Sequence, residues 1–266
     1  MAYWWCIVCL AIFLIGLTKS GFGSGAGLMI VPMTTLAMGH LRPGDNHAAL
    51  GLLLPLLTIG DVFAVGQYRK LFNRQIIARL LPGSVAGIIV GSFLLRWFIN
   101  QKDLAAALIQ TEIGAESVFL VSLHWYRMWR AKGQLPSFRP SLLRSSVVGC
   151  FAGVSSTLAH AAGPIIALHL LPQKLDRRAF IGTSAVYFFL VNSSKLPAYY
   201  KAGMFSGLSP RAIAQFVPLV FVGALFGRWL VKHINDRLFT TLVYLIAFVL
   251  GWYLLFKGGI VLVKRS

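Results

Sequence analysis

Three charged residues stand inside long apolar segments of this 266-residue chain. They are Lys19, Asp61 and Lys195, and Asn192 lies three residues before Lys195, hence on the same face of a helix. A charge is costly in an apolar segment, so each is expected to bind a ligand, carry a proton or form a pair. Two lysines with no matching pair of buried carboxylates favour a small anion over a cation. The alternative for either lysine is a side chain that reaches a nearby interface with water.

Asn192 and Asp61 are expected to serve different purposes. The amide of Asn192 offers both a donor and an acceptor, which together with Lys195 suits an oxyanion. Asp61 falls at the corresponding position of the first half of the chain. We expect Asp61 either to carry a coupling proton or to form an ion pair with a lysine.

The first of two interrupted apolar stretches holds a run of small and polar residues between residues 2–17 and 28–38. Alternate glycines from Gly21 to Gly27 let the backbone leave helical geometry and let a ligand approach. A half-helix beginning near Gly27 would turn unpaired N–H groups toward the gap, where an anion is stabilised. Close helix packing is the alternative. The residues expected to bind the anion here are Lys19, Ser20, Gly23, Ser24 and Gly25.

The second interrupted stretch runs from Ser155 to Pro164. Pro164 suits the first turn of a helix because its missing N–H would have no partner there. Gly163 and Pro164 therefore predict a second half-helix whose N-terminus also faces the gap and the anion. His160 is expected to donate to the anion or to bind a proton that changes its affinity, with a structural histidine as the open alternative.

The composition places the chain in a bilayer. Hydrophobic residues make up 57% and charged residues 12% of the sequence, and the mean hydropathy is +0.74, which leaves too little polar surface for a water-soluble globule. Runs of about 20 apolar residues can cross a hydrocarbon core of about 30 Å. Uninterrupted runs occur at 47–66, 77–99, 104–126, 178–200, 211–231 and 238–262. With the two interrupted stretches they make eight hydrophobic elements.

The net charge of +18 reads as a topology signal. Lys and Arg are spread over several loops between membrane-length segments, so no nucleic-acid partner is expected. The longest basic loops, around Arg69 and around Arg130, are assigned to the cytoplasm. The first residues lack the basic region of a removable signal peptide.

The chain divides into two similar halves. Residues 132–143 read as a linker between an N-terminal repeat, 1–131, and a C-terminal repeat, 144–266. Gly51, Asp61 and Tyr68 are spaced like Gly182, Asn192 and Tyr199, and Pro82, Gly87 and Gly91 are spaced like Pro218, Gly223 and Gly227. We therefore predict an all-α polytopic membrane protein of two four-element repeats, each with an interrupted or re-entrant first element.

The relative orientation of the repeats depends on those first elements. A hairpin plus three crossings in each half gives inverted repeats, whereas four crossings give parallel ones. As one helix, residues 3–38 would span roughly 54 Å, which is too long for a single crossing. We therefore expect hairpins and inverted repeats. Loop charges divide equally under both arrangements, so the side of the termini stays open.

Other chemistries are weakly supported. Cys6 and Cys9 have redox spacing but lie on an apolar helix, where cysteine behaves as a small hydrophobe. The histidines show no metalloprotease spacing, and no nucleotide-binding motif or nucleophile with a neighbouring base is present. We expect no cofactor, no metal site and no enzymatic activity.

The chain resembles a known family. Residues 18–28 with Val31-Pro32 look like the first glycine-rich signature of the sulfite exporter TauE/SafE family, also called the 4-toluene sulfonate uptake permease family. Residues 160–164, 175–185 and 192–195, with Tyr199, look like the signature of the family's second half. The resemblance therefore covers nearly the whole chain. The second break, Ala161-Ala162-Gly163, is poorer in glycine than is frequent in the family, and its contribution relative to the first break stays open.

The resemblance implies a bacterial inner-membrane permease for sulfur oxyanions such as sulfite, sulfoacetate or other organosulfonates, most often an exporter. We expect a secondary transporter that binds its anion near the midplane between the repeats and works by alternating access, with proton coupling through Asp61 as a hypothesis. The expected partners are the anion and the lipid bilayer, and a homodimer is left open. A passive anion channel and a membrane-embedded enzyme are the alternatives.

Overall fold

The computed structural model describes residues 2–21, 27–42, 48–68, 70–101, 104–130, 141–230, 233 and 236–265. The regular secondary structure in these ranges is helical, with no strand among them. The helices are α1 (Ala2–Gly21), α2 (Gly27–Leu41), α3 (Ala48–Tyr68), α4 (Arg74–Asn100), α5 (Ala105–Arg130), α6 (Leu142–Ala159), α7 (Ala162–Leu170), α8 (Arg177–Lys201), α9 (Pro210–Ala214), α10 (Val217–Leu230) and α11 (Asp236–Arg265), with a 3-10 turn at Leu171–Gln173.

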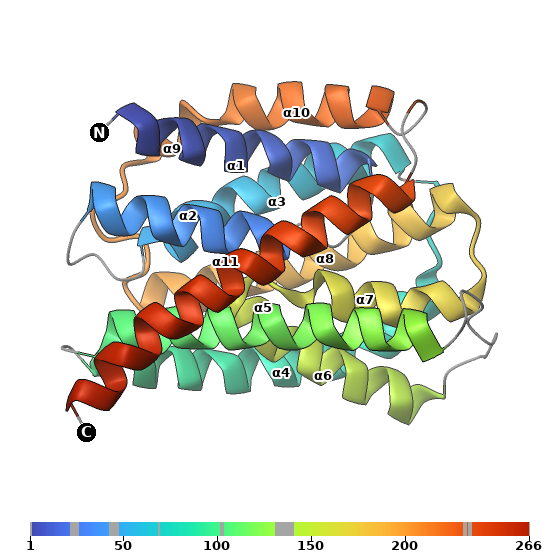
Figure 1. Ribbon diagram of the computed structural model, residues 1–266. Coiled ribbons are helices and arrows are strands. Elements are labelled where there is room, and N and C mark those ends of the chain that lie inside the picture. The colour runs from blue at the N-terminus through green and yellow to red at the C-terminus, as the bar shows by residue number, and fades with distance from the viewer. Residues whose placement is uncertain are drawn as a thin grey trace.

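Both interrupted stretches fold back on themselves. In Figure 1, α1 runs from the end that carries the N-terminus toward the opposite end, and α2 returns beside it. Helices α6 and α7 form a second such hairpin, in which His160 ends α6 in a left-handed conformation with φ of 50°. Both chain termini lie at one end of the bundle, and α3 and α5 finish at the other.

Seven of the described helical segments are long and apolar enough to cross a membrane. Helix α8 is not among them, although its 25 residues are sufficient in length. Polar residues such as Asn192 and Lys195 lower its hydropathy, and these two side chains are buried. Helix α8 packs against α3 and α4, so these two side chains face protein, whereas Ser194 and Tyr200 are exposed. The predicted run at 178–200 is therefore a helix with a buried polar face.

Glycines set the closest helix contacts, which join the two halves of the chain. Helix α4 of the first half packs on α6 of the second, and α10 of the second half packs on α1 of the first. Gly87 lies against the backbone of Cys150, and Gly227 lies against the backbone of Leu17. Small residues let these helix axes approach each other.

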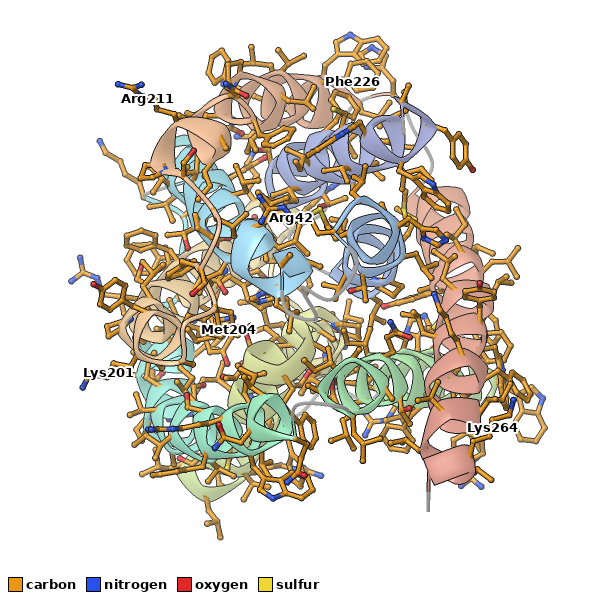
Figure 2. All side chains as sticks on the ribbon, turned by 90° about the vertical axis from the view of Figure 1, so that its left-hand side faces the viewer. Arg42, Lys201, Met204, Arg211, Phe226 and Lys264 are labelled. Atoms are coloured by element: carbon orange, nitrogen blue, oxygen red, sulfur yellow. The ribbon has the colours of Figure 1, made fainter. Side chains whose placement is uncertain are left out.

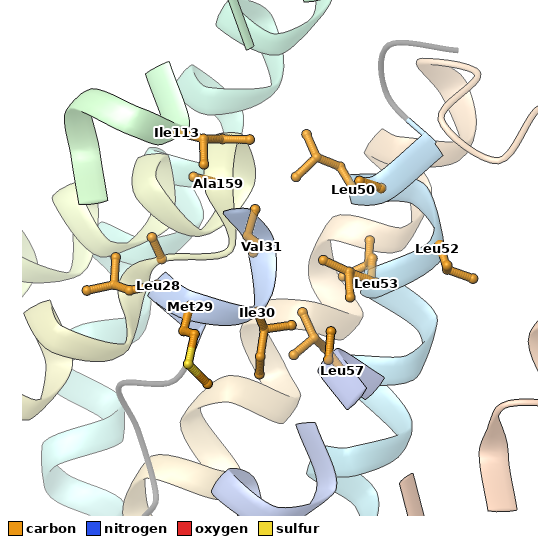
Figure 3. Close-up of a cluster of buried hydrophobic side chains, with 14 of the residues drawn as sticks. Leu28, Met29, Ile30, Val31, Leu50, Leu52, Leu53, Leu57, Ile113 and Ala159 are labelled. Atoms are coloured by element: carbon orange, nitrogen blue, oxygen red, sulfur yellow. The ribbon is translucent and has the colours of Figure 1, made fainter. Parts of the chain in front are cut away.

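The interior contains a cluster of aliphatic side chains around the start of α2. Figure 3 shows Leu28 and Ile30 of α2 between Leu53 of α3 and Ala159 at the end of α6, all of them buried. The outer surface is also apolar, with Phe93, Trp129 and Phe151 among the exposed side chains, as expected of helices that face lipid. Basic residues such as Lys201, Arg211 and Lys264 lie around the rim of the end that carries the termini (Figure 2).

Replacing Gly87 with alanine is expected to destabilise the protein by about 1–3 kcal/mol, because the added methyl group would overlap the Cys150 carbonyl. Gly66→Ala is the matched control, since its methyl group meets open space within α3 and alanine favours a helix over glycine. Thermal unfolding in detergent should give a lower melting temperature for Gly87→Ala alone. Equal melting temperatures would contradict this packing.

Candidate functional site

The first part of the site joins three helices through one carboxylate. Lys19 Nζ of α1 lies 2.6 Å from Asp61 Oδ1 of α3, and Asn192 Nδ2 of α8 donates to Asp61 Oδ2 at 2.6 Å. Lys19 also lies over the ring of Phe188 at 4.4 Å. The ion pair with Asp61 occupies one of the three ammonium hydrogens of Lys19.

The second part surrounds Lys195, which is 0% exposed. Its ammonium donates to Ser156 O at 2.7 Å and to Ser156 Oγ at 2.8 Å, and it lies 3.0 Å from His160 Nδ1. An ammonium has three hydrogens and accepts none, so His160 Nδ1 is the acceptor. His160 Nε2 then donates to Leu50 O at 3.2 Å. The histidine is therefore held as a neutral imidazole of one tautomer.

The two parts lie close enough to act as one electrostatic unit. Asn192 and Lys195 are one turn apart on α8, and both Lys19 and Asp61 interact electrostatically with Lys195. Two ammonium groups and one carboxylate leave one positive charge in excess. Such a buried charge is unfavourable unless a ligand or a neighbouring group compensates it.

Two tyrosines hold the ends of the broken helices. Tyr68 donates to the carbonyl of Ser20 at 3.0 Å, in the last turn of α1, and Tyr199 donates to the carbonyl of Thr157 at 2.6 Å, in the last turn of α6. The final carbonyls of a helix have no partner within it. The tyrosines therefore satisfy groups that the breaks leave open.

The second half-helix of each hairpin begins in the interior. Helix α2 starts at Gly27 and α7 at Ala162, so Gly163 and Pro164 fall in the first turn of α7, as predicted from the sequence. Both residues are buried. Ala161 provides no side-chain cap to the first N–H groups of α7, which leaves these dipoles available to an anion.

The structure brings most of the predicted site residues together. Lys19, Asp61, His160, Asn192 and Lys195 form the two linked parts, and Asp61 makes the ion pair that was one of its two alternatives. Lys195 does not reach an interface with water. Ser20 is buried, and its hydroxyl has no hydrogen-bond partner among the described residues. Gly23, Ser24 and Gly25 lie outside the described residues.

Helix α5 also contains two partly buried carboxylates that we did not predict as site residues. Glu112 and Glu116 lie one turn apart on α5, and a side-chain hydrogen bond joins their carboxyl groups. The signal was present in the sequence as two glutamates four residues apart within the predicted membrane run at 104–126.

No group of three or more His, Cys, Asp and Glu side chains that could hold a metal ion occurs among the described residues. The described cysteines, Cys6, Cys9 and Cys150, are free thiols. Apart from the Asp61 carboxylate, the site is made of ammonium, amide, hydroxyl, imidazole and backbone N–H groups, which are mostly donors. This donor set suits an oxyanion.

Comparison with known proteins gives one match. The family model described as "Sulfite exporter TauE/SafE" matches residues 8–254, which is nearly the whole chain and includes every residue of the site. No curated protein and no solved structure matches the chain.

A double-mutant cycle on Lys19 and Asp61 tests the ion pair. Lys19→Gln and Asp61→Asn should each destabilise the protein by about 3–5 kcal/mol, because each removes one partner of an ion pair whose other member stays in the interior. The double variant should lose less than the sum of the two. Unfolding in detergent measures all four forms, and strictly additive losses would show that the two groups do not interact.

Proposed function

Because the chain belongs to the sulfite exporter TauE/SafE family of membrane transporters, we propose that it is a secondary transporter of a small sulfur oxyanion such as sulfite, sulfoacetate or another organosulfonate. It is a multi-pass inner membrane protein with seven apolar candidate spans among its described residues. The anion is taken from one side of the bacterial inner membrane to the other, with export as the favoured direction.

The excess positive charge of the site is the observation that carries this proposal. Lys19 and Lys195 face a single carboxylate, Asp61, within a region that is shielded from water. An oxyanion would complete the neutralisation and would accept hydrogen bonds from the donors around it. A cation would meet two ammonium groups and is disfavoured.

The anion is proposed to lie between the two breaks, near the midplane. From one side it would contact the remaining hydrogens of Lys19, with Ser20 and the predicted residues Gly23, Ser24 and Gly25. From the other it would contact Lys195, Asn192, His160 and the N–H groups at Gly163. All three ammonium hydrogens of Lys195 already have acceptors, so the anion must displace one of these acceptors to bind Lys195.

An inverted repeat is proposed for the architecture, and three kinds of contact support it. The equivalently spaced Asp61 and Asn192 bond to each other. Tyr68 and Tyr199 each donate to the last turn of a broken helix. In chain order, α1, α3, α4 and α5 of the first half are equivalent to α6, α8, α10 and α11 of the second. The contact of α1 with α10 then corresponds to that of α6 with α4, and the contacts α3–α8 and α5–α11 each join two equivalent helices. The halves remain those of the sequence, 1–131 and 144–266, with 132–143 as the linker.

Alternating access follows from this arrangement. The breaks come from opposite halves, so rocking one half against the other would open the same site to either side in turn. Asp61 is a candidate for the coupling proton, because it can exchange its ion pair with Lys19 for a proton when the anion arrives.

Replacing Lys195 with methionine is expected to abolish anion counterflow in proteoliposomes, because it removes the donor to the anion and half of the positive charge. Lys201→Met on the same helix is the matched control, since Lys201 is exposed, and it should keep wild-type counterflow. The panel contains sulfite, sulfoacetate, taurine, sulfate and carboxylates. Flux without counterflow in the wild type would indicate a channel instead.

Cysteine labelling tests the inverted architecture. In a variant without the native cysteines, Tyr3→Cys lies in the first turn of α1, Lys264→Cys in the last turn of α11 and Lys70→Cys in the basic loop just after the end of α3. The end of α3 lies opposite the two termini (Figure 1). The positive-inside rule places that loop in the cytoplasm. An impermeant thiol reagent should label the first two positions in intact spheroplasts and Lys70→Cys only after permeabilisation. Labelling of the termini from the cytoplasmic side would contradict the proposal.

A further inference from the structure

The carboxyl pair on α5 has no function in the anion site described above. Glu112 and Glu116 share a hydrogen bond, and because an ionised carboxylate only accepts, one proton must lie between them. The groups that act on the two carboxyls are each other and Ser155, with no described cation among them. A pair of this kind can bind a further proton without breaking an existing ion pair.

A second observation concerns the residue that faces the pair. Ser155 on α6 is only 5% exposed, and its hydroxyl faces Glu116. Ser155 Oγ and Glu116 Oε2 are both buried without another hydrogen-bond partner among the described residues. Because a hydroxyl can donate as well as accept, Ser155 can donate to Glu116 while that carboxylate is ionised and accept from it once a proton is bound.

Few other titratable groups surround the pair. Tyr199 of α8 is electrostatically coupled to Glu112. On α11, Lys257 precedes Gly258, which packs on Thr111, and Tyr244 lies against His124 of α5 itself with their rings tilted by 43°. Other charged and titratable residues of the packed segments are His40, Arg74, Arg79, Arg96, Arg144, His160, His169, Lys264 and Arg265. Both ring nitrogens of His160 already form hydrogen bonds, so His160 cannot bind a proton without losing its contact with Lys195.

Three consecutive residues connect the pair to the anion site. Ser155 faces Glu116, Ser156 holds Lys195 through its carbonyl and hydroxyl, and Thr157 accepts from Tyr199, the residue coupled to Glu112. All three belong to the last turns of α6. A change at the carboxyl pair therefore reaches the groups that hold Lys195 within one stretch of backbone.

We propose that Glu112 and Glu116 form a proton-binding site whose occupancy is coupled to that of the anion. The net charge predicts the sign of this coupling. Lys19, Lys195 and Asp61 together carry one positive charge, and the carboxyl pair with a single proton carries one negative charge that cancels it. A second proton restores the positive charge, which the anion then neutralises. Proton and anion should thus favour each other's binding, and this coupling, although not the proton site itself, rests on the proposed function.

Infrared spectroscopy of the ligand-free, reconstituted protein tests the proton site. The wild type should show the carbonyl band of a protonated carboxyl group that changes between acidic and alkaline buffer. The double variant Glu112→Gln/Glu116→Gln should lack this change. Asp176→Asn is the matched control, since it removes an exposed carboxylate but keeps the N-cap of α8, and it should retain the band. A band that persists unchanged in the double variant would overturn the proposal.

Binding of methanesulfonate, whose charge does not change with pH over this range, tests the coupling. Its affinity for the wild type should fall by up to about tenfold per pH unit toward alkaline pH. The double glutamine variant mimics the fully protonated pair, so it should bind tightly at every pH. A wild-type pH dependence in that variant would overturn the coupling. A second outcome would also overturn it. If NaCl but not choline chloride raised the melting temperature of the wild type, and neither salt raised that of the double variant, the carboxyl pair would bind Na⁺ and not a proton.

If the wild type binds neither methanesulfonate nor any anion of the panel, the proposed function fails. The infrared result still decides whether Glu112 and Glu116 bind a proton.

Discussion

The structure depends on one constraint, which is that Lys195 keeps an ammonium group in the interior without a carboxylate of its own. Its three hydrogens need acceptors, and the end of α6 supplies them. The Ser156 carbonyl accepts from Lys195 through its second lone pair, in addition to the His160 N–H at 3.2 Å, and the Ser156 hydroxyl accepts as well. The break ends α6 at Ala159, and the left-handed His160 places its Nδ1 at the same ammonium.

The breaks place opposite ends of helix dipoles around one region. Lys19 lies in the last turn of α1, and Lys195 is held at the last turns of α6, so both cations meet the negative end of a helix. The starts of α2 and α7 bring the positive ends into the same interior. Each break therefore stabilises a lysine with one half-helix and leaves the other half-helix to face a negative ligand. This explains why the interior tolerates two ammonium groups.

The sequence predicted what depends on residue type and spacing. The cost of burying Lys19, Asp61 and Lys195 marked the site, and glycine or proline marked both breaks. The contact between Asp61 and Asn192 was not predictable, because equal spacing in two halves does not tell whether equivalent residues meet. The conformation of His160 and its tautomer depend on Leu50 and Lys195, which lie far away in the chain. Glu112 and Glu116 lie in the predicted run at 104–126, but their spacing alone does not tell whether their side chains face lipid or protein.

Packing also constrains which helices can move. The glycine contacts bring the backbones of α4 and α6 together, and likewise those of α10 and α1, so sliding along these pairs would force main-chain atoms into each other. We infer that each pair moves as a unit although its members come from different halves. The α3–α8 contact is different, because the hydrogen bond of Asp61 with Asn192 can be exchanged for bonds to a ligand. Anion binding next to this contact would then weaken what holds the two units in one position, which is what a transporter requires of its substrate.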